Sequence, residues 1–122
     1  MPRFVILHHE MPLGDERPSH WDFMLQWGDV LKTWALQEPP EAGKTTGATA
    51  LDDHRAAYLD YEGPVSGGRG SVTRWDAGTY QLVRQSEEEL VVTLAGARLS
   101  GRVTLARASD NPDSWTVSLA AD

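Results

Sequence analysis

The sequence predicts an all-β protein, a small closed barrel of about eight mostly antiparallel strands with one or two short helices. Short alternating apolar runs, separated by turn residues, fill the second half of the chain. Eleven Gly and seven Pro among 122 residues supply the turns that many short strands need. Closure is favoured because it removes exposed strand edges. The length suits one hydrophobic core, so we expect a single domain over residues 1–122.

Three strands are expected in the first third of the chain. Residues 4–7 are a continuous apolar run. Residues 20–27 alternate, which predicts a strand with one mainly aromatic and one mainly polar face. The first face holds Trp21, Phe23, Leu25 and Trp27, and the second holds His20, Asp22, Met24 and Gln26. Gly28-Asp29 then predicts a hairpin turn into a return strand at residues 30–36.

The middle of the chain is expected to be mostly loop. Pro and Gly are frequent over residues 39–47 and again, as Gly, over residues 63–70. Between these loops, residues 52–58 are predicted to form one or two helical turns with Asp52 or Asp53 as the N-cap. Five strands are then expected, at residues 71–76, 79–85, 90–94, 102–107 and 115–119. Turns are predicted between them, at residues 77–78, 86–88, 95–96 and 109–113.

Composition limits the possible functions. The net charge is −7, from 11 Lys and Arg against 18 Asp and Glu. Tight sequence-independent DNA binding needs a basic face, so it is not expected, whereas weak, local binding of one nucleotide or one strand end is compatible with this charge. No apolar run has transmembrane length and no signal peptide is apparent, so we expect a cytoplasmic protein without a membrane partner. The absence of Cys leaves His and carboxylate as metal ligands.

His20 and Asp22 form the most informative pair. At positions i and i+2 of a strand they share one face, so both can bind the same ion. His8 or His9 can supply a third ligand, and because they are adjacent only one of them can face the pair. Such a set suits Mn²⁺, Zn²⁺ or Fe²⁺ better than Ca²⁺ or Mg²⁺. An exposed polar strand face would show the same letters, and the spacing by itself leaves that interpretation open.

Other polar residues have both a chemical and an ordinary interpretation. His54 can donate a hydrogen bond or a proton to a metal-bound phosphate, or it can be a surface His on a short helix. Arg69, in a Ser-Gly-Gly-Arg-Gly segment, can belong to a phosphate-binding loop or to a simple turn. The five Trp residues fit core or rim packing better than a base-stacking platform.

Five segments, taken in chain order, match the motifs of one family. Residues 20–25 (HWDFML) correspond to H-Y-D-F-R-L, and residues 30–36 (VLKTWAL) to V-L-K-S-W-A-V. Residues 51–63 (LDDHRAAYLDYEG) correspond to v-E-D-H-P-l-d-Y-a-d-F-E-G, and residues 70–80 (GSVTRWDAGTY) to G-t-V-i-v-W-D-r-G-t-W. Residues 99–107 and the strand at Trp115 complete the series. Over nearly the whole chain, the sequence resembles the 3′-phosphoesterase module of bacterial DNA ligase D, as a stand-alone, divergent member.

The resemblance implies a β-barrel that binds Mn²⁺ and trims 3′ ends before ligation in non-homologous end joining. Family members remove a 3′-phosphate and a terminal ribonucleotide. Zn²⁺ or another divalent transition metal stays open as an alternative to Mn²⁺. The implied metal ligands are His9, His20 and Asp22. The implied catalytic residues are His54, at the reacting phosphate, with Tyr58 and Asp52 beside it. The implied partners are a nucleic-acid 3′ end or a nucleotide, and a separate ligase or polymerase.

The sequence departs from the family at its phosphate-binding positions. Met24 stands where the family has Arg, Glu38 where it has Lys, Thr46 or a neighbour where it has a second Arg, and Asp52 where it has Glu. Arg17, Arg55 and Arg69 are candidate replacements. Two alternatives therefore stay open: a catalytically impaired, metal-binding relative that serves as a binding or scaffold module, and a phosphoesterase acting on a small non-nucleic-acid substrate.

Overall fold

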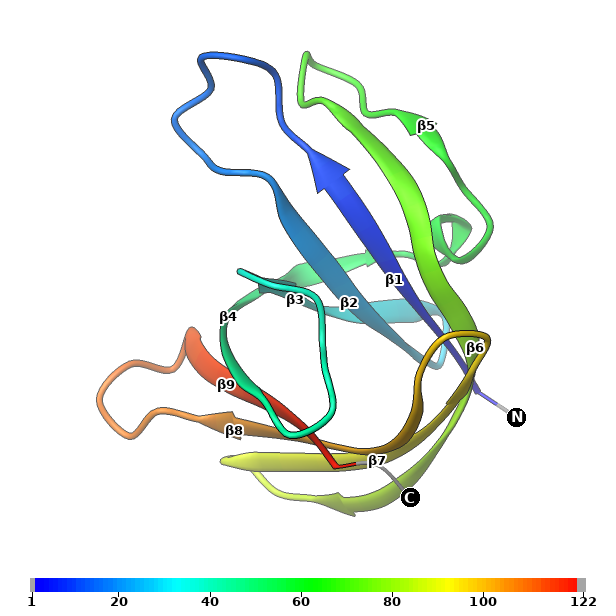
Figure 1. The fold of residues 1–122 in the computed structure, drawn as a ribbon, viewed down its shortest axis with the longest axis vertical. Coiled ribbons are helices and arrows are strands. Elements are labelled where there is room, and N and C mark those ends of the chain that lie inside the picture. Colours follow the sequence, from blue (N-terminus) through cyan, green and yellow to red (C-terminus); the bar gives the residue numbers. More distant parts are fainter. Residues whose placement is uncertain (1, 121–122) are drawn as a thin grey trace.

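Eight antiparallel strands close into a barrel in the computed structural model, which describes residues 2–120 (Figure 1). The order around the barrel is β1-β2-β3-β4-β9-β8-β7-β6, and β6 returns to pair with β1, while the short β5 adds to β6 outside the ring. The predicted closed all-β barrel is confirmed. The elements are β1 (Arg3–Glu10), β2 (His20–Trp27), β3 (Val30–Leu36), β4 (Thr45–Arg55), η1 (Ala56–Leu59), β5 (Gly63–Pro64), β6 (Ser71–Gln85), β7 (Glu89–Gly96), β8 (Ser100–Arg107) and β9 (Ser114–Ala120).

Two predicted turns are wrong. β7 includes Ala95 and Gly96, so the chain turns at residues 97–99 instead. β6 runs without interruption through Ala77 and Gly78. The first part of β6 pairs with β1, and the part from Gly78 onward pairs with β7. A Cβ on Gly78 would lie 2.0 Å from the carbonyl oxygen of Ala95. Glycine therefore allows two backbones to approach closely where the strand changes neighbours, and the chain does not reverse there.

The predicted helix over residues 52–58 is also wrong in its first half. β4 continues to Arg55, and only Ala56–Leu59 is helical, as a 3₁₀ turn without a side-chain N-cap. Leu51 and His54 pair with positions of β3 that are two residues apart, so two β4 residues oppose one β3 residue in a bulge. Pairing with β3 thus outweighs the local capping preference of the two Asp residues. β4 also begins at Thr45, so the loop expected over residues 39–47 is shorter.

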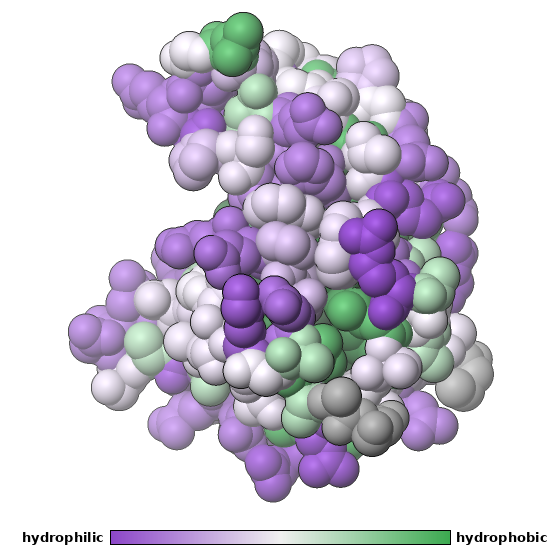
Figure 2. Space-filling view, viewed as in Figure 1, coloured by the Kyte–Doolittle hydropathy of each residue, from purple (hydrophilic) through white to green (hydrophobic). Residues whose placement is uncertain are grey.

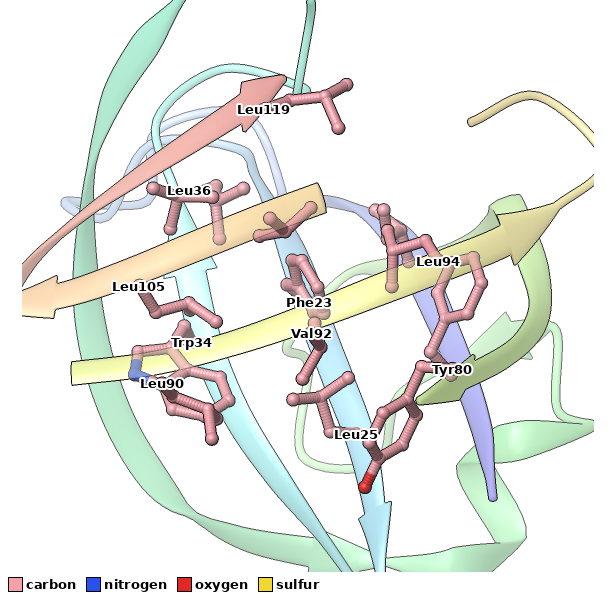
Figure 3. Packing of buried hydrophobic residues seen from close by; sticks show 14 of the residues in the cluster. Phe23, Leu25, Trp34, Leu36, Tyr80, Leu90, Val92, Leu94, Leu105 and Leu119 are labelled. Atoms are coloured by element: carbon pink, nitrogen blue, oxygen red, sulfur yellow. The ribbon is translucent and has the colours of Figure 1, made fainter. Parts of the chain in front are cut away.

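Two apolar clusters lie on opposite faces of the barrel wall. The interior cluster includes Phe23, Leu25, Trp34 and Tyr80, which point into the barrel in Figure 3. The second cluster lies on the outer face of the β1–β2–β3 wall, where η1 and the segment around Val65 cover it. It contains Val5, Leu7, Met24, Leu31, Leu59 and Val72. The expected apolar face of β2 is confirmed, and Met24 on the other face is buried as well.

Large apolar side chains are exposed at scattered positions of the described surface: Leu13, Leu51, Tyr61, Leu82 and Val83. Most of the face shown in Figure 2 is hydrophilic, with apolar patches between polar side chains. Within residues 2–120, no helix is long and apolar enough to span a membrane. The expected location of the protein stays a prediction.

Candidate functional site

His9, His20 and Asp22 come together on the outer face of the barrel. The two His residues are paired neighbours where the β1–β2 hairpin opens into its loop, and Asp22 follows two positions along β2. One ligand atom from each residue lies within 4.8 Å of the others. His8 faces the opposite way, with its ring stacked on Trp21 at a centroid distance of 4.6 Å and an interplanar angle of 8°. The structure therefore groups His9, and not His8, with His20 and Asp22.

Backbone carbonyls fix the outer nitrogen of each imidazole ring. His9 Nε2 lies 2.6 Å from the carbonyl oxygen of Arg69, and His20 Nδ1 lies 3.1 Å from that of Pro18. A carbonyl oxygen can only accept, so each of these nitrogens carries a hydrogen and donates it. In the neutral ring, the other nitrogen then carries a lone pair. Both lone pairs point toward the same carboxylate.

These two nitrogens lie close to the buried carboxylate of Asp22. His9 Nδ1 is 3.2 Å from Oδ2, and His20 Nε2 is 3.0 Å from Oδ1. Asp22 is 3% exposed, and its Oδ1 has no partner with hydrogen-bond geometry among the described residues, so the short His20 contact is mainly electrostatic. Two imidazole lone pairs and a buried carboxylate oxygen repel each other unless a positive charge lies between them. A divalent transition metal fits this donor set, and each ring is oriented as metal-ligating His residues usually are.

The protonation of the group is consistent with a site for a cation. Burial is the largest influence on Asp22 and opposes its ionisation, but the contacts and charges of His20 and His9 outweigh burial and lower its pKa below the ordinary value. The pKa of His20 is raised, chiefly by its contact with Asp22. The contact between His20 and Asp22 therefore favours the charged form of each group.

The three residues open into a cleft of about 740 Å³. Arg17 of the β1–β2 loop and Arg69 of the loop before β6 line it, as do Asp52 and His54 of β4. The molecule is hollowed on one side in Figure 2, between the β1–β2 loop and the loop joining β8 to β9. His54 Nδ1 lies 2.8 Å from the Asp52 carbonyl oxygen and donates to it, which leaves Nε2 as the free ring nitrogen.

Two of the residues expected at the site lie outside this cleft. Arg55 follows His54 along β4, and it lines a second, smaller cavity instead. Tyr58 lines that same cavity, although its ring meets the His54 ring edge-on at a centroid distance of 5.7 Å. The cleft therefore contains seven of the nine expected side chains, and Tyr58 touches it through His54.

The departures from the family pattern also have definite places. Met24 is 1% exposed and packs in the outer apolar cluster. Glu38 is exposed in the loop after β3, and Thr46 is half-buried on β4; neither lines the cleft. The reversed charge at Glu38 is therefore not part of the cleft wall.

The two carbonyl groups that orient the His rings were not predicted, since backbone groups leave no residue signature. One indirect signal exists in Gly70, which has φ +78° and where a Cβ would lie 1.9 Å from the carbonyl oxygen of Glu10. Only glycine fits at that point, and its lack of a side chain allows the loop before β6 to pack directly against the end of β1. The Arg69 carbonyl is thereby brought to His9.

Comparison with known families decides the relationship. The family model of the DNA ligase D 3′-phosphoesterase domain matches residues 9–107, a range that begins at His9 and includes every residue of the cleft named above. The chain belongs to this family. Its relatives include "Multifunctional non-homologous end joining DNA repair protein LigD" of Mycobacterium tuberculosis, 34% identical over 92% of this chain. Another is "Multifunctional non-homologous end joining protein LigD" of Pseudomonas aeruginosa, 32% identical over 84% of it. The chain spans 15% and 13% of the lengths of these two ligase D proteins.

Proposed function

We propose that this ligase D-type domain is a metal-dependent 3′-phosphoesterase that removes a 3′-phosphate or a 3′-terminal ribonucleotide from nucleic-acid ends during DNA end repair. The proposal rests chiefly on one observation. The carbonyl-anchored rings of His9 and His20 direct their lone pairs at the buried Asp22 carboxylate, at the base of a cleft that also contains His54. Membership of the 3′-phosphoesterase family supports the same chemistry.

His9 Nδ1, His20 Nε2 and an oxygen of Asp22 would hold the metal, and Mn²⁺ or Zn²⁺ suits this mixture of nitrogen and carboxylate ligands. When bound, such an ion polarises a phosphoryl oxygen and lowers the pKa of a coordinated water. Three protein ligands leave coordination positions for substrate and water, as in catalytic metal sites. The anchored tautomers keep both rings ready to bind without reorientation.

His54 and the two cleft arginines would act on the phosphate itself. Because the Nδ1–H of His54 is held by a carbonyl, its protonated ring can donate from Nε2 to a phosphate oxygen. Arg17 and Arg69 can pair with the remaining charge, at roughly 1.5–3 kcal/mol for each charged hydrogen bond. The Nε of Arg69 donates to the carbonyl of Ser66 at 2.8 Å, which restricts its guanidinium before substrate arrives. These arginines would supply the positive charge that the family Arg provides at the position of Met24.

A terminal phosphate group suits the small number of cations around the cleft. The net charge of −7 disfavours binding along a length of duplex, whereas two arginines suffice for one phosphate. The named ligase D relatives are multifunctional end-joining proteins. We infer that this domain works in the same process on a nucleic-acid 3′ end, and that a ligase or polymerase activity completes the repair.

The test is hydrolysis of a labelled primer–template bearing a 3′-phosphate or a 3′-terminal ribonucleotide, with Mn²⁺ or with EDTA. His9→Ala and His8→Ala are a matched pair, since the two residues are adjacent on β1 and face opposite ways. We expect His9→Ala to abolish trimming and His8→Ala to retain it. His54→Ala should lower the rate by about 10²–10³-fold, the usual cost of one donor to transition-state charge. Equal loss in both members of the pair would contradict the proposed metal site.

The alternative of a metal-binding but inactive module is favoured by the loss of the family Arg at Met24 and by the acidic charge. It predicts that Mn²⁺ raises the melting temperature of the wild-type protein, that His9→Ala removes this effect, and that neither 3′ end is trimmed. A screen of small phosphate esters under the same conditions would then test for a non-nucleic-acid substrate.

A further inference from the structure

A second cavity of about 230 Å³ lies on the other side of Tyr58 from the cleft. Its walls come from η1 and the segments around β5, which lie together beside β6 in Figure 1. Tyr58 and Tyr61 meet edge-on within it, at a ring centroid distance of 5.8 Å, and Pro64 and Val65 add apolar surface. The proposed chemistry of the cleft makes no use of this cavity.

The cavity and the cleft share two walls. The first is a row of three rings, in which His54 lines the cleft and meets Tyr58, and Tyr58 meets Tyr61 inside the cavity. The second is the loop before β6, where Ser66 lines the cavity, Arg69 lines the cleft, and the Arg69 side chain bonds to Ser66. The cleft and the cavity are therefore neighbours, separated by a single layer of side chains.

The lining indicates the chemistry of the occupant. The volume is below the roughly 300–1,000 Å³ of sites that enclose a drug-sized ligand, so it suits a single ring system. Aromatic walls bind the flat face or edge of a nucleobase whatever its identity. Arg55 lines the cavity and has no carboxylate within ion-pair distance among the described residues, so its charge is available to a ligand. A ring attached to a phosphate meets both requirements.

We propose that this cavity binds a base of the strand whose 3′ end occupies the cleft, with Arg55 at the phosphate of that nucleotide. The inference rests on the proposed function, because it assigns the strand in the cavity to the substrate of the cleft. It explains how an acidic domain can recognise a nucleic-acid end, since affinity comes from one stacked base and a few phosphates. It also gives Arg55 a role distinct from that of Arg17 and Arg69.

The experiment measures the dissociation constant of a fluorescent 3′-phosphate primer–template in EDTA, where the proposed metal-dependent hydrolysis is stopped. Tyr61→Ala removes the ring, and Tyr61→Phe is the matched control that keeps the ring but loses the hydroxyl, which donates to the Pro64 carbonyl. Each variant is also measured with primers that lack one base at each of the last three positions. We expect Tyr61→Ala to weaken binding about tenfold, equal to ~1.4 kcal/mol, and Tyr61→Phe to bind as the wild type does. One abasic primer should weaken wild-type binding by the same factor and abolish the effect of Tyr61→Ala.

Arg55→Ala supplies an independent arm. If Arg55 meets a phosphate, the slope of log K against log salt should fall by about 0.7–0.9 for this single contact. The proposal is overturned if Tyr61→Ala weakens all abasic primers equally, if it changes nothing, or if Tyr61→Phe loses as much affinity as Tyr61→Ala. An unchanged salt slope in Arg55→Ala overturns the phosphate assignment. Base-dependent binding without trimming in Mn²⁺ would instead reject only the proposed hydrolysis.

Discussion

The two faces of the β1–β2 hairpin differ in what they contribute to the molecule. On the inner face, Phe4, Ile6 and Phe23 are fully buried and belong to the barrel core. On the outer face, Met24 belongs to an apolar cluster. At the end of the hairpin next to the β1–β2 loop, the same face carries Asp22 and the two His residues, which line the cleft. Strand alternation thus allows eight-residue segments to support both stability and the proposed chemistry, with little coupling between them.

Asp22→Asn should have the largest effect on the outer face. The neutral amide keeps the shape of the side chain but cannot supply the charge that both imidazoles face. We expect loss of the stabilisation that Mn²⁺ gives the wild type, and loss of 3′-end trimming by more than about 100-fold, beyond the usual cost of losing an outer-shell partner. Thermal melting with Mn²⁺ and with EDTA measures the first effect, because a ligand that binds the folded state raises its stability.

In EDTA, Asp22→Asn should melt only slightly below the wild type. The lowered pKa of Asp22 means that its ionised form contributes some stability, which the amide loses. Both imidazoles can be neutral, so no buried charge is left without a partner. If Mn²⁺ stabilised the variant as much as the wild type, the metal site would have to be elsewhere.

Phe23→Ala tests the inner face one position along the same strand. Phe23 is fully buried between Phe4 and Trp34, with ring centroids 6.4 Å from each. Removal of the ring should lower the free energy of unfolding by about 3–5 kcal/mol in urea titrations. The Mn²⁺ affinity of the folded fraction should stay close to that of the wild type. A parallel loss of affinity would show that the two faces are coupled.

Gly70→Ala tests the loop that holds the outer face in place. A side chain there costs about 1–2 kcal/mol for the left-handed backbone, and the Cβ would also clash with the Glu10 carbonyl. The loop must move, so the Arg69 carbonyl should leave His9 and Mn²⁺ affinity should fall about 10–100-fold. Gly68→Ala is the control, because φ is +69° and nothing lies within 4 Å of its added Cβ. Equal Mn²⁺ affinity in the two variants would refute the positioning role.

Alternation predicted more of the site than local propensity did. The i, i+2 spacing of His20 and Asp22 placed them on one face, and the opposite directions of His8 and His9 meant that only one could join them. Both arguments need only the geometry of a single strand. Closure of the barrel was also predictable, since a short chain with many strands must satisfy its edges.

The end of β4 shows where sequence analysis was limited. Asp52 and Asp53 resemble a helix cap, but a bulged pairing with β3 extends the strand, and such pairing depends on residues some twenty positions away. Had residues 52–55 been recognised as a strand, alternation would have placed His54 and Arg55 on opposite sides. The mistaken expectation that Arg55 would lie at the cleft follows from that one error. The carbonyls of Pro18 and Arg69 could not have been predicted, because loop conformation places them.

Tyr80→Phe should have the smallest effect on stability. Unlike the other substitutions on the inner face, its effect should depend on pH. The Tyr80 hydroxyl donates to the Gln26 carbonyl at 2.6 Å, and burial raises the Tyr80 pKa above its ordinary value of 10.0. At neutral pH, the variant should lose about 1 kcal/mol of stability with this hydrogen bond. The unfolded chain ionises first as pH rises above 10.0, so the Tyr80 contribution is complete below that pH and is lost as pH rises through the higher folded-state pKa. Urea unfolding at neutral and alkaline pH should therefore show a difference between wild type and variant that narrows with pH. A constant difference would mean that the buried phenol does not titrate with unfolding. The Mn²⁺ affinity at neutral pH should be the same in both proteins, because Tyr80 faces the barrel interior.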